Sequence, residues 1–132
     1  MKFLASIVVL ALAVGYIKSE ELTKENAIAV AAACKEEQGA SDDDVEALKN
    51  HEAPSTHEGK CMAACIMEKF GVLADGKMVK EKAIEVGIAL FGDDEAKATA
   101  IVEACESLEV DDDHCEAAVQ YGACLKEHAL AH

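Results

Sequence analysis

The chain has 132 residues, of which 52% are hydrophobic, and its 12 lysines and 26 acidic residues give a formal net charge of −14 without a single arginine. This length is typical of one domain. An acidic surface argues against binding to nucleic acid and to anionic membranes, because both depend on lysine and arginine, so we expect no nucleic-acid partner and no membrane insertion.

The N-terminal segment has the pattern of a secretory signal peptide. Lys2 gives it a basic start, and residues 3–14 form an apolar run interrupted by one serine. That run is too short to cross a bilayer, which takes about 20 apolar residues. Cleavage after Gly15 or after Ser19 fits the small-residue rule, and we favour Ser19 because the polar sequence begins there. We therefore expect a secreted, extracellular protein.

Cleavage at Ser19 divides the chain into a signal peptide, residues 1–19, and a single domain, residues 20–132. Losing Lys2 and Lys18 leaves ten basic residues against 26 acidic ones, a net charge of −16 for the mature chain. A charge of this size favours solubility at high concentration.

The mature chain is predicted to be all-α. Its segments are rich in Ala, Glu, Lys and Leu, and none shows the alternating pattern of a strand. Glycines and one proline separate the helical segments, and capping-box patterns at Ser41, Ser55 and Asp113 mark three helix starts. We expect six short helices, a turn and a tail. The helices cover about 23–38, 41–50, 55–70, 79–91, 93–108 and 113–128, the turn 72–76 and the tail 129–132.

All six cysteines follow the signal peptide, which favours three disulfides in an oxidising compartment. They are Cys34, Cys61, Cys65, Cys105, Cys115 and Cys124. Six cysteines allow 15 pairings, and the spacing alone does not choose among them. Cys61 and Cys65 lie one turn apart on the same side of a helix, so that helix could be bonded to two other segments at once.

The cysteine spacing, x26-x3-x39-x9-x8, resembles that of the insect odorant-binding proteins, the pheromone-binding and general odorant-binding group. The x3 and x8 intervals are fixed in that family, and the run at residues 59–65 is similar to its third helix. The resemblance covers the whole mature chain. It implies six helices around an internal apolar cavity, and the disulfides Cys34–Cys65, Cys61–Cys115 and Cys105–Cys124.

The resemblance also implies a function. The family's members are soluble carriers that bind small hydrophobic molecules, such as odorants, pheromones and similar lipophilic semiochemicals, and transport them through aqueous extracellular fluid, here sensillar lymph in olfaction. The expected partners are a small hydrophobic ligand and, in an encounter, an odorant receptor. The protein itself is expected to be a monomer or a weak homodimer.

Candidate ligand contacts are the large apolar side chains of the third, fourth and sixth predicted helices and the turn, because a carrier site needs apolar walls and few polar groups. Tyr121 adds a hydroxyl that could bond a ligand oxygen. Each residue could instead be ordinary core, which periodicity does not distinguish from a cavity wall. The candidates are Ile66, Phe70, Leu73, Val79, Ile84, Ile88, Phe91, Val119, Tyr121 and Leu125.

Other classes of function have less support. The chain has no Cys-x2-Cys pair for a metal, no Gly-x-Ser-x-Gly or His-Glu-x-x-His motif, and no adjacent cysteines like those of secreted phospholipases. We therefore expect no metal, no cofactor and no enzymatic activity. The alternatives kept are a cytokine-like or venom-like secreted interaction protein, and a lipophile carrier without a sensory role.

Overall fold

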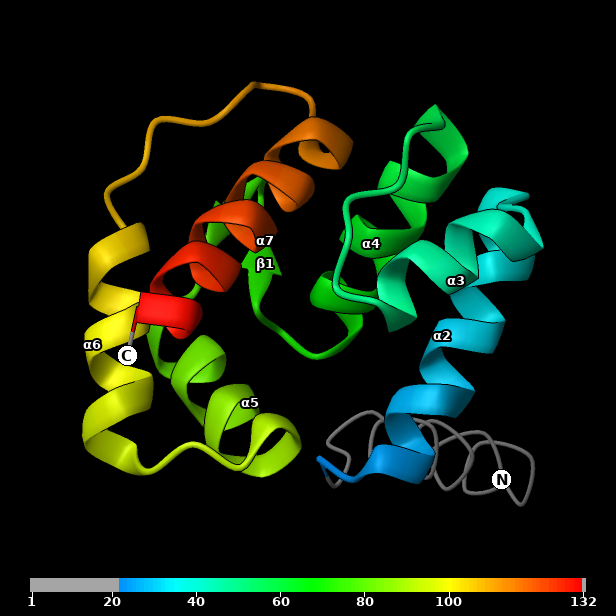
Figure 1. Ribbon diagram of the computed structural model, residues 1–132. Helices are drawn as coiled ribbons and strands as arrows, with labels where there is room; N and C mark the ends of the chain where they lie inside the picture. The colour runs from blue at the N-terminus through cyan, green and yellow to red at the C-terminus, as the bar shows by residue number, and fades with distance from the viewer. Residues whose placement is uncertain (1–21, 132) are drawn as a thin grey trace, which may run out of the picture.

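A computed structural model describes residues 22–131, and within them the chain forms six α-helices and one short β-hairpin (Figure 1). The predicted signal peptide lies outside the described residues. The helices are α2 (Lys24–Gln38), α3 (Asp42–Lys49), α4 (His57–Lys69), α5 (Lys80–Phe91), α6 (Glu95–Cys105) and α7 (His114–Ala131). The strands are β1 (Leu73–Ala74) and β2 (Lys77–Met78).

Helix α4 is the centre of the packing. It has its most extensive contacts with α7 on one side and α2 on the other, while α5 packs on α6 and α6 on α7. Figure 1 shows α2 and α3 gathered on one side of α4, and α5, α6 and α7 on the other. Five consecutive residues of α4, 61–65, are buried, so this helix contributes to the core on more than one face.

The prediction that no segment forms a strand is wrong at residues 73–78. Leu73 pairs with Met78 and Ala74 with Lys77 in an antiparallel hairpin. The turn predicted here is present, since Asp75 and Gly76 take positive φ angles of 51° and 77° and close the loop. Strands of two residues are too short to show an alternating sequence pattern, which explains the error.

The helix boundaries differ from the prediction at three places. Helix α7 continues to Ala131, through most of the expected tail, and α6 ends at Cys105 rather than near 108. The capping box at Ser41 is present, with reciprocal bonds to Asp44. At α4 the cap is Thr56 and not Ser55, because the Thr56 hydroxyl accepts the backbone N–H of Gly59 at 2.9 Å.

Asp44 joins the starts of α3 and α4. It is 3% exposed, and it is the one buried polar or charged residue among the described residues. Its carboxylate accepts the backbone N–H of Ser41 at 3.0 Å and the hydroxyl of Thr56 at 2.9 Å. Thr56 in turn caps α4, so one buried carboxylate stabilises two helix starts. The Ser41 amide holds the pKa of Asp44 below its usual range, with the Thr56 and Ser41 hydroxyls acting the same way against desolvation.

The hydrophobic core consists of three small clusters rather than one large one. The first contains Leu73, Tyr121 and four alanines of α4 and α7, which are Ala63, Ala64, Ala117 and Ala118. The second surrounds the Cys34–Cys65 disulfide, and the third joins Val72, just before β1, to Ala83 of α5 and Val102 of α6. Because alanines make up so much of the α4–α7 contact, the two helix backbones approach closely there.

Gly59 has no room for a side chain. A Cβ at this position would lie 2.5 Å from both Asp44 Oδ1 and Pro54 Cβ. Gly59→Ala should therefore lower the free energy of unfolding by about 1–3 kcal/mol, the usual cost of overpacking. Gly122→Ala is the matched control, because a Cβ there meets nothing within 4 Å in helix α7, and it should be neutral or stabilising by up to about 1 kcal/mol. Urea unfolding of both variants checks this, and equal midpoints would contradict it.

Asp44→Asn should make stability less dependent on pH. Since the pKa of Asp44 is lowered on folding, the unfolded chain binds this proton more readily than the folded chain does. The stabilisation from the carboxylate is thus complete above the unfolded pKa, about 3.9, and is lost as the pH falls through the lower folded pKa. Thermal melts from neutral pH down to about 3 should show the difference between wild type and Asp44→Asn shrinking with acidity. The control Asp43→Asn, at an exposed position in the same turn, should show no such convergence.

Candidate ligand-binding site

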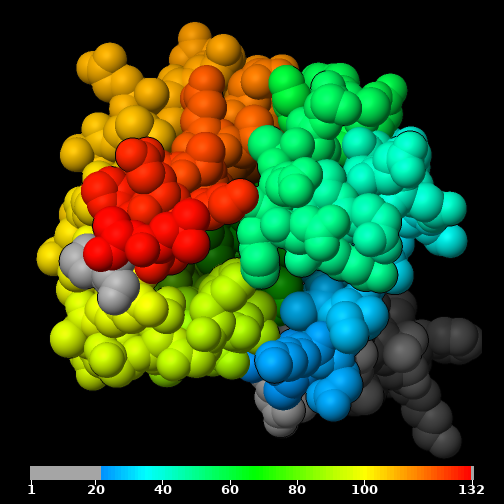
Figure 2. Space-filling view, in the orientation of Figure 1, coloured from blue at the N-terminus to red at the C-terminus, as the bar shows by residue number. Residues whose placement is uncertain are grey.

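A hollow opens in the middle of the face seen in Figure 2. Its border is formed by α7, by the segment that joins α3 to α4, by α5 and by the first half of α2, and the atoms visible at its floor belong to the green part of the chain. We call this feature the central hollow. It lies where the two groups of helices on either side of α4 face each other.

Two of the predicted ligand contacts are almost completely buried by the fold. Leu73 is 2% exposed and Tyr121 is 1% exposed, and both belong to the alanine-rich cluster between α4 and α7. The ring of Tyr121 is the largest fully buried side chain of the described residues. The structure therefore brings these two residues together in one part of the interior.

Six further predicted contacts are half-buried and surround the three clusters. Val119 packs against the cluster that contains Tyr121, and Ile66 against the cluster around Cys34 and Cys65. Phe70, Ile84 and Leu125 pack against the third cluster, and Val79 is half-buried at the start of α5. Each of these side chains keeps some accessible surface.

The last two predicted contacts, Ile88 and Phe91, are exposed on α5, at 40% and 62%. Neither is enclosed by other described residues. The Phe91 ring contacts the ring of His51, with centroids 6.0 Å apart and planes tilted by 56°. His51 lies in the segment between α3 and α4, so this contact joins two borders of the central hollow.

The sequence reasoning missed four apolar residues that pack against the Tyr121 cluster. They are Leu48, Met67, Met78 and Val110. Met78 belongs to strand β2, which was not predicted, Met67 lies near the end of α4, and Val110 lies in the segment between α6 and α7. The hairpin brings Met78 beside β1 through its pairing with Leu73, and this long-range placement has no local sequence signal.

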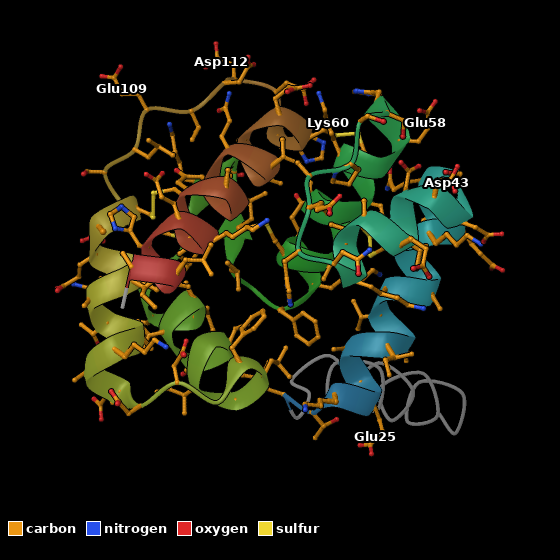
Figure 3. All side chains as sticks on the ribbon, viewed as in Figure 1. Glu25, Asp43, Glu58, Lys60, Glu109 and Asp112 are labelled. Carbon is orange, nitrogen blue, oxygen red and sulfur yellow. A yellow bond between two sulfur atoms is a disulfide. The ribbon has the colours of Figure 1, made fainter. Side chains whose placement is uncertain are left out.

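Apart from the buried Asp44, the charged side chains of the described residues lie at the surface of the molecule. Figure 3 shows the labelled residues, among them Glu25, Asp43 and Asp112, at the periphery and pointing outward. The half-buried lysines are each paired with a carboxylate, and these pairs are Lys35–Asp42, Lys60–Glu116, Lys80–Glu103 and Lys97–Asp93. Within residues 22–131 the interior thus has no buried cation. No helix of this part is long and apolar enough to cross a membrane.

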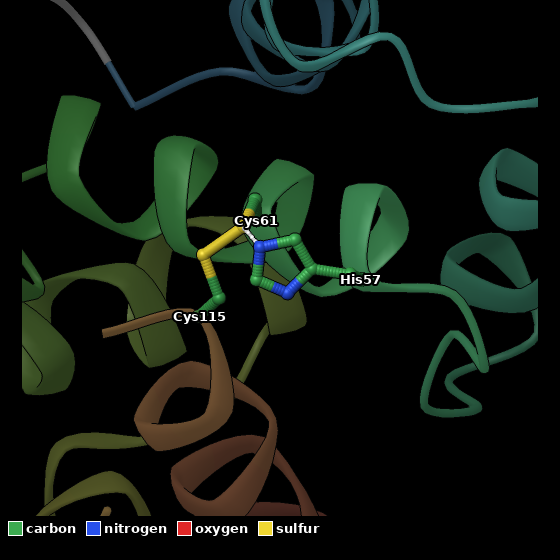
Figure 4. Close-up of side chains that lie close together, drawn as sticks. All are labelled: His57, Cys61 and Cys115. Atoms are coloured by element: carbon green, nitrogen blue, oxygen red, sulfur yellow. Dashed lines mark hydrogen bonds between the residues drawn. A yellow bond between two sulfur atoms is a disulfide. The ribbon is translucent and has the colours of Figure 1, made fainter. Parts of the chain in front are cut away.

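The His, Cys and acidic groups that come close together in the described residues do not offer thiolates to a metal. Figure 4 shows one such group, in which His57 Nε2 lies 3.5 Å from Cys61 Sγ while Cys61 is bonded to Cys115. Each of the other groups also includes at least one disulfide sulfur. A cysteine binds a metal as the thiolate, which a disulfide sulfur cannot supply, so these clusters are poor metal sites.

Three disulfides hold the helices that surround the hollow. They pair Cys34 with Cys65, Cys61 with Cys115, and Cys105 with Cys124. This is the pairing that the family resemblance implied, and it is confirmed. Helix α4 is bonded to α2 and α7, and α7 is bonded again to α6. The scaffold is that of an all-α, three-disulfide binding protein with apolar side chains around an open interior.

The comparisons with known proteins identify the particular family. The chain matches the PBP/GOBP family over residues 18–128. It is 41% identical to General odorant-binding protein 19d of Drosophila melanogaster over 119 residues, which cover 84% of this chain and 79% of that protein. It is 40% identical to General odorant-binding protein 28a of the same fly, covering 77% and 74%. The chain therefore belongs to the PBP/GOBP family, as the cysteine spacing indicated.

Solved structures agree with the fold. The odorant-binding protein dmelOBP28a from Drosophila melanogaster superposes with a TM-score of 0.74 at 36% identity, over 80% of this chain and 91% of that one. The fatty acid binding protein OBP56a from the oral disk of the blowfly Phormia regina gives 0.67 at 25% identity, over 86% and 99%. The predicted six-helix, three-disulfide fold is confirmed, and a carrier is favoured over the cytokine-like or venom-like alternative.

Replacing each disulfide by two alanines should destabilise the protein in the order of the loops it closes. The bridges span sequence separations of 54, 31 and 19 residues, for Cys61–Cys115, Cys34–Cys65 and Cys105–Cys124. Loop entropy gives losses of roughly 3–4 kcal/mol each, with the longest loop costing about 1 kcal/mol more than the shortest. Urea unfolding under non-reducing conditions measures the order. A largest loss at Cys105–Cys124 would show that loop entropy does not govern these bridges.

Proposed function

We propose that this protein is a secreted carrier, which binds one small hydrophobic molecule among the apolar side chains around the central hollow and transports it through aqueous extracellular fluid. The observation that supports this most is the partial burial of the large apolar side chains. Most of those on α4, α5 and α7 are half-buried, packed against small clusters rich in alanine and cysteine. They provide apolar surface that a ligand could cover, at about 25 cal/mol for each Å² removed from water.

The proposed ligand contacts are the ten residues predicted from the sequence, arranged from the inside outward. Leu73 and Tyr121 form the buried end, the half-buried side chains form the walls, and Ile88 and Phe91 stand on α5 at the border of the hollow. Odorants, pheromones and other lipophilic semiochemicals have the size and polarity for such a site. The name of the blowfly relative adds fatty acids to the ligands that merit testing.

The acidic surface fits transport through water. A net charge of −16 on the mature chain repels other copies and anionic membranes, which favours a soluble monomer or a weak homodimer. Transport in sensillar lymph and an encounter with an odorant receptor are the sensory form of this proposal. A carrier in another tissue would use the same site. No enzymatic step is part of the proposed function.

A displacement assay with the fluorescent apolar probe N-phenylnaphthylamine tests the carrier function. The oxidised protein should bind the probe at micromolar concentration, and terpenoid or fatty ligands should displace it. Ile88→Ala should weaken binding by about three- to tenfold, because it removes apolar contact surface. Leu108→Ala is the matched control, since Leu108 is 38% exposed, like Ile88 at 40%, but lies beyond α6. Absence of probe binding by the folded protein would sink the proposal.

A further inference from the structure

The hydroxyl of Tyr121 is an unpaired polar group in the apolar interior. The residue is 1% exposed, and its ring lies among the alanines of α4 and α7 beside Leu73. Within the described residues the hydroxyl makes no hydrogen bond to the protein. A hydroxyl in apolar surroundings that has no protein partner is satisfied by water or by a ligand, so this oxygen can take a partner from outside the chain.

The hydroxyl oxygen is not sealed in. Every fully enclosed side-chain nitrogen or oxygen of the described residues has a hydrogen-bond partner. Since the Tyr121 hydroxyl has none, the small accessible surface left to this residue includes its oxygen. The oxygen therefore faces a space that solvent or a ligand can reach, while the ring around it is fully packed. Such a single polar group in an apolar site is what fixes the orientation of a small ligand.

The surrounding charges restrict which ligand this hydroxyl can serve. The half-buried lysines already pair with carboxylates, and the one buried charged side chain is the acidic Asp44. A ligand carboxylate would lose its hydration without gaining a cation, which is costly in an apolar interior. The net negative charge of the whole chain adds to that cost. A ligand with an uncharged oxygen pays neither the cost of burying an unpaired charge nor the cost of repulsion by the acidic chain.

We propose that Tyr121 is the specificity-determining residue of this carrier, and that the site selects neutral ligands with an apolar body and one hydrogen-bonding oxygen: alcohols, aldehydes, ketones or esters. This inference rests on the proposed carrier function. The phenol donates a hydrogen bond to the ligand oxygen, and with an alcohol it can also accept one. Saturated hydrocarbons bind through the apolar walls alone, and carboxylates bind less well than their neutral esters.

Displacement of N-phenylnaphthylamine by four ligands with the same carbon chain tests the selection: dodecane, dodecanol, methyl dodecanoate and dodecanoate. Wild type should prefer dodecanol and the ester over dodecane by about three- to tenfold, the effect of one hydrogen bond. Dodecanoate at neutral pH should be weaker than the ester. Tyr121→Phe should abolish the preference and leave the affinity for dodecane unchanged. Ser107→Ala, which removes an exposed hydroxyl beyond α6, should change nothing.

Two results would overturn the inference. One is an unchanged preference for dodecanol in Tyr121→Phe, and the other is dodecanoate binding as tightly as the methyl ester. Neither result would contradict the proposed carrier function. That proposal fails only if the wild-type protein does not bind the probe. The phenol itself supplies a second readout that needs no variant, because Tyr121 is the sole tyrosine of residues 22–131 and the chain has no tryptophan. Dodecanol should shift the phenol absorption and dodecane should not, and equal spectra would contradict the proposed bond.

Discussion

The structure depends on one constraint, which is that Cys61 and Cys65 project from the same side of α4, one turn apart, and bond to different helices. Cys65 holds α2 and Cys61 holds α7, so α4 is fixed between two neighbours at once. Because the two bridges fix α4, small side chains are enough on the face of α4 that contacts α7. Alanines suffice at 63 and 64, and the core can stay as three small clusters with half-covered apolar groups between them.

The disulfides and one buried carboxylate add to the stability that packing provides. In most domains a dense core supplies the net stability, and an open interior would cost several kcal/mol. Here three bridges also reduce the entropy of the unfolded chain, and the buried Asp44 joins the starts of α3 and α4 with hydrogen bonds. The bridging cysteines and Asp44 are themselves buried, but neither device depends on filling the interior with large apolar side chains. The interior can therefore leave apolar surface uncovered for a ligand without losing the fold.

The sequence predicted the part of this design that is encoded locally or by cysteine spacing. Helix caps such as Ser41, the glycine and proline breaks and the family's disulfide pattern were sufficient for six helices and three bridges. It did not reveal that Asp44, a surface-like residue at a helix start, is buried and reaches Thr56 across a loop. It also did not separate Leu73 and Tyr121, which are enclosed, from Ile88 and Phe91, which are exposed. Those outcomes depend on how helices meet, which helical periodicity does not record.

Charged side chains lie mainly at the surface and apolar side chains mainly in the interior. This distribution determines which ligands the site can bind. Among residues 22–131 the half-buried lysines are paired with carboxylates, so this part of the chain leaves no half-buried cation free for a ligand. Around Tyr121 the described residues offer apolar surface and one phenol oxygen without a protein partner. Apolar contact then supplies binding affinity for many ligands of suitable size. A single hydrogen bond can make the affinity higher for ligands with an oxygen in the right place. Because a carrier must also release its ligand, an interior that binds through area and one modest hydrogen bond suits that task better than one that binds through a buried ion pair.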